Sequence, residues 1–155
     1  MPPEAVTRRD RAAAAPAAVR GLSVWLLLAG VLHAGSIAWP WSGQALWWLQ
    51  LLALAAAVWL IGQPVAGGDS RRRAFRAGFL RGWLFAVAWL CTTFWWLYVS
   101  MHTYGGMPAW LAGGAVLLLA AALALYYALA AGVWLAWRAA HPHRPWGGLL
   151  FGALW

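Results

Sequence analysis

The chain has 155 residues, of which 65% are hydrophobic and only 9% are charged, against about 25% charged residues in a soluble domain. Its mean hydropathy of +0.68 excludes an ordinary soluble fold, because a chain of this size has too little interior to hide so much apolar surface. The net charge of +8 comes from eleven arginines that gather between apolar segments, so it indicates membrane orientation, and we expect no nucleic-acid partner.

The first segment of the chain is polar, rich in proline and alanine, and carries four arginines. We predict that residues 1–21 form a basic tail on the cytoplasmic side of a membrane. The apolar stretch at residues 22–39 has two interpretations: a retained transmembrane helix, or a secretory signal with a cleavage site at residues 36–38. Charge does not separate them, because cleavage would leave the later spans in the same orientation.

Two further apolar spans lie on either side of the strongest charge cluster in the chain. The second span, residues 44–61, has Trp47 and Trp48 near one end and Trp59 near the other. Tryptophans at both ends are typical of a helix that reaches the two membrane interfaces. The third span, residues 77–99, follows a cluster of four arginines.

The third span carries residues that predict how it packs. Gly78 and Gly82 are four positions apart, a spacing that lets a neighbouring helix approach closely. Arg81 lies near the cytoplasmic end, from where we expect its side chain to extend to the interface. Cys91 is the only cysteine and lies among apolar residues, so we predict a packing role for it.

The fourth span, residues 108–137, would be about 45 Å long as a helix, against a bilayer core of about 30 Å. Small residues recur at every fourth position and predict a packing stripe: Ala120, Ala124, Ala128, Gly132 and Ala136. The apolar segment that starts at residue 146 has too few residues to cross a bilayer. We therefore predict an all-α integral membrane protein, with four transmembrane helices and the start of a fifth in one N-terminal helical domain, residues 22–155.

The arginines of the connections predict the orientation of these spans. The tail and the connection before the third span hold four each, and residues 138–145 hold two, whereas residues 40–43 and 100–107 hold none. Arginine is enriched in cytoplasmic loops of membrane proteins. We therefore predict a cytoplasmic N-terminus and a periplasmic turn around His102.

That outer turn holds polar side chains but lacks the third residue that a catalytic triad needs. Ser100, His102 and Tyr104 are close in sequence, yet no carboxylate follows Asp69 to orient a Ser–His pair. The chain also has no phosphate-binding loop and no cluster of metal ligands, and the two histidines at 141 and 143 are more typical of a solvated loop. We predict no catalytic, cofactor-binding or metal-binding residue in this chain.

The run at residues 96–108 reads W-L-Y-V-S-M-H-T-Y-G-G-M-P. It resembles the outer turn of bacterial apolipoprotein N-acyltransferases, whose pattern is close to Y-V-S-x-H-x-aromatic-G-G-x-P. Residues 73–85 are similar to that family's lead-in to the same helix, residues 29–40 to its first helix, and residues 47–54 to its second. The likeness covers roughly residues 22–155 and favours a retained first helix, as in the family.

The resemblance implies a bacterial inner-membrane enzyme with a helical membrane part and a periplasmic nitrilase-like domain. The family transfers a fatty acyl chain from a phospholipid acyl donor to the N-terminal diacylglyceryl-cysteine of a lipoprotein, through a cysteine thioester assisted by Glu and Lys. No position of this chain matches those three residues, and Cys91 lies in mid-span. The chain thus resembles the N-terminal part of such an enzyme, and its end within a helix predicts a truncation, a frameshift or an incomplete sequence.

Within that family, the outer turn has an expected role in substrate access. We expect an entrance for lipid substrates to be lined by His102, Tyr104, Gly105, Gly106 and Pro108. The alternative is a non-enzymatic protein, either a small polytopic membrane scaffold or a transporter subunit. A transporter is disfavoured because no acidic residue lies within a span.

Overall fold

The computed structural model of the chain describes residues 21–37, 43–65 and 70–141. Every regular element in these ranges is helical: Gly21–Ile37 (the first helix), α2 (Trp47–Ile61), α3 (Arg71–Thr93), α4 (Trp95–Val99), the π-helix η1 (Ser100–Tyr104) and α5 (Ala109–Ala140). The prediction of an all-α fold is confirmed for this part of the chain.

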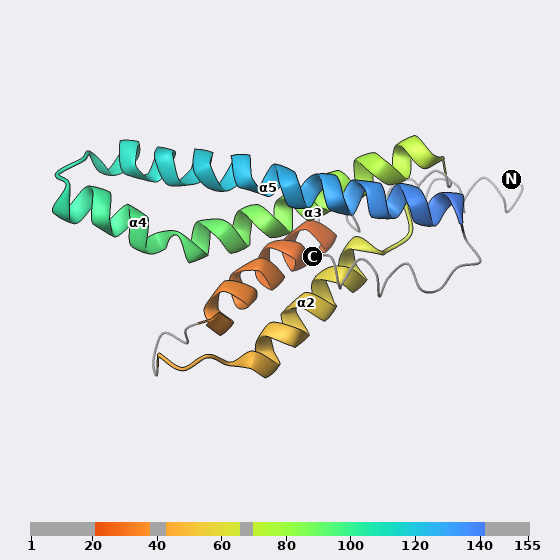
Figure 1. The fold of residues 1–155 in the computed structure, drawn as a ribbon, viewed down its shortest axis with the longest axis horizontal. Helices are drawn as coiled ribbons and strands as arrows, with labels where there is room; N and C mark the ends of the chain where they lie inside the picture. The colour runs from red at the N-terminus through yellow and green to blue at the C-terminus, as the bar shows by residue number, and fades with distance from the viewer. Residues whose placement is uncertain (1–20, 38–42, 66–69, 142–155) are drawn as a thin grey trace, which may run out of the picture.

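The helices form two hairpins that pack on each other (Figure 1). In the longer hairpin, α3 and α4 follow one another and α5 returns beside them. The shorter hairpin consists of the first helix and α2, and the amide of Leu46 donates a 2.8 Å hydrogen bond to the carbonyl oxygen of Ser36 between them. A buried cluster joins the two hairpins: Leu26, Ala29, Ala57, Leu60, Ile61, Ala74, Phe85, Ala131, Trp134 and Leu135.

Small residues bring α3 and α5 together at short range. A Cβ atom added at Gly82 would lie 2.6 Å from the Cβ of Ala131, closer than two side chains can approach. The predicted packing stripe of α5 is buried at all of its positions: Ala120, Ala124, Ala128, Gly132 and Ala136. Both the close approach at Gly78 and Gly82 and the role of the stripe are therefore confirmed.

Arg81 links the two hairpins at one end of the molecule. Its Nη1 atom donates hydrogen bonds to the carbonyl oxygens of Ile61 at 2.8 Å and Gln63 at 2.6 Å, and Nη2 donates to Pro64 at 3.2 Å. Carbonyl groups at a helix C-terminus have no partner within the helix, so a cation there is favourable. That this side chain extends to the membrane interface stays a prediction, and the structure adds that it binds the end of α2.

Two of the four predicted spans, α3 and α5, are long and apolar enough to cross a membrane. The first helix and α2 are apolar but shorter, at 17 and 15 residues, or about 25 and 22 Å. The third span also differs from its predicted bounds: α3 begins at Arg71, because Ser70 accepts a hydrogen bond from the amide of Arg73 and caps the helix. The basic tail up to residue 20 and the predicted helix start at residue 146 lie outside the described residues.

Candidate functional site at the turn between α4 and α5

The polar run after residue 99 continues the helix instead of ending it. α3 ends at Thr93, and Phe94 separates it from α4. The chain then continues from α4 directly into the wider π-helix η1. The amide of Gly105 donates to the carbonyl oxygen of Ser100 at 3.0 Å, five residues back, which is the spacing of a π-helix. Residues 100–104 contain neither Gly nor Pro, so nothing in them stops the helix before Gly105.

The turn itself depends on two glycines and one histidine. Gly106 has φ = +67°, a conformation that disfavours any side chain, and a Cβ at Gly105 would lie 2.7 Å from the carbonyl oxygen of Met101. The ring nitrogen Nδ1 of His102 lies 2.8 Å from the carbonyl oxygen of Met107. Since a carbonyl oxygen only accepts, Nδ1 must carry the proton in this contact. His102 therefore closes the turn from the side.

All five predicted site residues lie in this one exposed turn: His102, Tyr104, Gly105, Gly106 and Pro108. Tyr104 is 85% exposed and Trp110, at the start of α5, is 77% exposed. The ring of Tyr98 stacks on Trp95 at 5.0 Å and faces His102 at 5.5 Å between centroids. The turn thus brings the ring of Trp95 next to the more polar rings of Tyr98 and His102. Such a surface is typical of the membrane–water boundary.

The geometry gives this turn no catalytic apparatus of its own. The described part of the chain contains no Asp or Glu, so no carboxylate orients His102 for work as a base. Nor do the described residues include a group of three or more His, Cys, Asp or Glu that would hold a metal ion. Cys91 is partly buried and packs against a cluster that includes Ala86 and Leu90.

The sequence analysis did not single out His33, which the first helix places in the interior. This side chain is only 3% exposed and packs edge-on against Trp89 at 4.8 Å, with Phe85 at 5.9 Å. Its Nδ1 atom has no hydrogen-bond partner among the described residues. The ring contacts of His33 with Trp89 and Phe85 are those of a packing residue.

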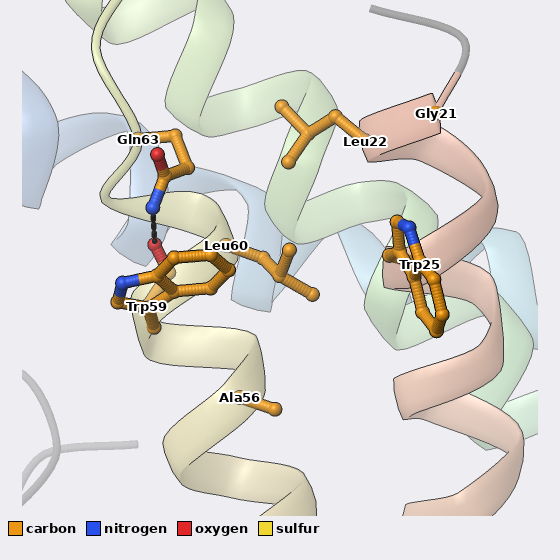
Figure 2. Close-up of a pocket in the computed structure, with 7 residues that line it drawn as sticks. All are labelled: Gly21, Leu22, Trp25, Ala56, Trp59, Leu60 and Gln63. Atoms are coloured by element: carbon orange, nitrogen blue, oxygen red, sulfur yellow. Dashed lines mark hydrogen bonds between the residues drawn. The ribbon is translucent and has the colours of Figure 1, made fainter. Parts of the chain in front are cut away.

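A cleft of about 540 Å³ lies between the first helix and α2, away from the turn (Figure 2). Trp25 lines it from the first helix, and Trp59 and Leu60 line it from α2. Its one amide side chain, Gln63, donates to the carbonyl oxygen of Trp59 at 3.3 Å. Among the described residues that line the cleft, none carries a titratable side chain.

Replacing His102 with phenylalanine is expected to loosen the turn without unfolding the helices. The ring is kept but the hydrogen bond to Met107 is lost, a change of about 1 kcal/mol, or about fivefold in the opening equilibrium. Hydrogen–deuterium exchange should therefore quicken about fivefold at the amides of Gly105 and Met107. Tyr104→Phe, which alters an exposed ring in the same turn, should leave both amides unchanged. Equal exchange in the two variants would contradict the assigned role of His102.

The family described as the apolipoprotein N-acyltransferase N-terminal domain matches residues 29–155. A protein named apolipoprotein N-acyltransferase from Verminephrobacter eiseniae is 52% identical over 131 residues, which is 84% of this chain and 23% of that protein. The proteins of the same name from Ralstonia nicotianae and Bordetella bronchiseptica are 41% and 42% identical, over 83% and 84% of this chain and 22% and 23% of theirs. No solved structure gives a significant match.

Proposed function

Because the chain belongs to the apolipoprotein N-acyltransferase N-terminal domain family, we propose that it is the N-terminal membrane part of such an enzyme. The proposed reaction transfers a fatty acyl chain from a phospholipid to the N-terminal S-diacylglyceryl-cysteine of lipoproteins. The observation that carries the proposal is the family match over residues 29–155, which includes the turn at residues 100–108. The chain spans less than a quarter of the length of the three relatives described above, and the proposal assigns the chemistry to the remaining length of the enzyme.

The proposed location is the bacterial inner membrane, with four helices crossing it. Two crossings are α3 and α5, and the proposal adds the first helix and α2 as shorter ones. The crossing proposed for α2 is supported by its exposed apolar side chains, among them Leu51 and Leu52. Such side chains are more stable in lipid than in water. The arginines before α3 support a cytoplasmic position for that end and, with it, a periplasmic position for the turn at His102.

Within the enzyme, the proposed role of the turn is to line the entrance for lipid substrates. This role fits a surface that is exposed, aromatic and free of carboxylates, built from His102, Tyr104, Gly105, Gly106 and Pro108. The glycines keep the backbone accessible, because a side chain at either position is disfavoured by the local conformation or by Met101. A π-helix next to this surface agrees with the frequent placement of such segments at functional sites.

The proposal is tested in a chimera in which residues 29–155 replace the matching region of the Verminephrobacter eiseniae protein. The chimera is expected to restore lipoprotein N-acylation in a strain depleted of its own enzyme, measured as the mass of the lipoprotein N-terminus. A chimera that reaches the membrane at normal levels but leaves lipoproteins unacylated would contradict the proposed function.

In the same chimera, Gly106→Val is expected to lower N-acylation by about ten- to a hundredfold, because a misplaced turn misaligns the incoming substrate. Gly105→Val should act in the same direction. Gly114→Val is the matched control, since a Cβ at Gly114 meets nothing within 4 Å. Membrane levels of each variant are followed by immunoblot. Unimpaired acylation by Gly106→Val at normal levels would remove the turn from the proposed entrance.

A further inference from the structure

A groove of about 480 Å³ lies between the start of α3 and the end of α5. Its lining combines cationic, aromatic and apolar side chains: Arg71, Arg72, Phe75, Val133, Ala136 and Trp137. The arginines belong to the first turn of α3 and Trp137 to the last turn of α5. Phe75 and Val133 lie about one turn from them along their helices, and Ala136 directly precedes Trp137. The groove thus has a cationic mouth and an apolar wall.

The mouth carries an excess of positive charge. Residues 69–76 hold four arginines and one acid, Asp69, and the described residues contain no Asp or Glu. The amide groups at the start of a helix add partial positive charge at the same place. Arg71 and Arg72 precede Phe75 by four and three positions, so all three share one face of α3. This face attracts an anion and offers it an apolar surface directly beside the charge.

The aromatic side of the mouth is held in place by contacts of its own. The ring of His141 stacks on Trp137 with centroids 5.1 Å apart, and Nδ1 of His141 donates to the carbonyl oxygen of Trp137 at 3.1 Å. A fixed indole beside two guanidinium groups is suited to the boundary between lipid headgroups and acyl chains.

We propose that this groove binds one anionic phospholipid, with its phosphate between Arg71 and Arg72 and an acyl chain along Phe75, Val133 and Ala136. Basic pockets between membrane helices bind anionic headgroups in this manner, and the apolar wall explains why a lipid is a better occupant than a free phosphate. The lipid class follows from the groove itself. Its placement in the cytoplasmic leaflet rests on the topology proposed above.

The test uses the 155-residue chain purified in detergent and native mass spectrometry with added lipid. Phosphatidylglycerol is expected to be retained about tenfold or more over phosphatidylcholine with the same acyl chains. The double variant Arg71→Gln/Arg72→Gln should lose this preference. The matched control is Arg73→Gln/Arg76→Gln, which changes the net charge equally through arginines that do not line the groove and should keep the preference. Equal loss in both variants would overturn the proposal, because it would show a non-specific effect of charge.

A second variant tests the apolar wall without touching the arginines. Val133 is exposed on α5, so Val133→Trp fills the groove while leaving the charges and the helix packing intact. This variant should also lose the preference for phosphatidylglycerol, and circular dichroism should show that it remains folded. Soluble sn-glycerol 3-phosphate should not displace the lipid. Displacement by that compound, together with undiminished binding by Val133→Trp, would identify a simple phosphate site and overturn the proposal.

Discussion

Replacing Gly78 with leucine is expected to separate α3 from α5 and to leave little folded protein in the membrane. A Cβ at this position would run into the backbone of Ala131 and would lie 2.9 Å from Cδ1 of Leu135. The nearest atoms belong to the main chain of Ala131, which cannot make room by a change of side-chain rotamer. We expect a loss of about 3 kcal/mol in the free energy of unfolding, the upper end for overpacked sites. The measurement is thermal unfolding of the purified chain in detergent, followed by circular dichroism.

The control for this prediction lies in α5. Gly113→Leu introduces the same side chain where a Cβ meets nothing within 4 Å, so it should be neutral or slightly stabilising through helix propensity. Gly82→Leu should behave like Gly78→Leu, because its Cβ would overlap Ala131. If Gly78→Leu unfolds at the same temperature as Gly113→Leu, the close packing of α3 on α5 is wrong.

Replacing Arg81 with alanine is expected to detach the end of α2 from α3. Three carbonyl oxygens lose their donor, those of Ile61, Gln63 and Pro64. A hydrogen bond from a charged group contributes about 1.5–3 kcal/mol, and the three bonds share one side chain, so we expect a total loss of about 2–4 kcal/mol. Hydrogen–deuterium exchange should quicken first in the last turn of α2, before global unfolding.

Two further variants separate the loss of hydrogen bonds from the loss of charge. Arg81→Lys keeps the charge but lacks the planar fork of the guanidinium, so it should recover only part of the stability. Arg76→Ala removes an exposed arginine of the same helix and should have little effect. Equal stability of Arg81→Ala and Arg76→Ala would show that the bonds to α2 do not hold the hairpins together.

The packing of the long hairpin was predictable because its signals repeat along the sequence. In α3 two glycines are four positions apart, and in α5 a small residue recurs at every fourth position. Small residues let two helices approach closely, and both sets lie at the interface between α3 and α5. That the five predicted site residues share one turn was also predictable, since they lie within seven positions of sequence. Its internal bond from His102 to Met107 was not, because a histidine in a polar run has no preferred partner before the turn is known.

Contacts between distant segments were beyond sequence reasoning. Arg81 and its three acceptors are 17 to 20 positions apart, and an arginine near a membrane interface has water and headgroups as equally plausible partners. The bounds of the third span stay a prediction, and the π-helix at residues 100–104 was not foreseen. A helix already under way is extended by each added hydrogen bond until glycine interrupts it.

The contact between Arg81 and α2 bears on how the protein is synthesised. When the ribosome has completed α2, the carbonyl oxygens at its end are exposed, and the arginine that binds them is still 17 to 20 codons away. Until α3 is made, these carbonyl oxygens have no guanidinium group to accept from. The contact that joins the two hairpins can therefore form only after Arg81 has been synthesised, later than the contacts within the shorter hairpin.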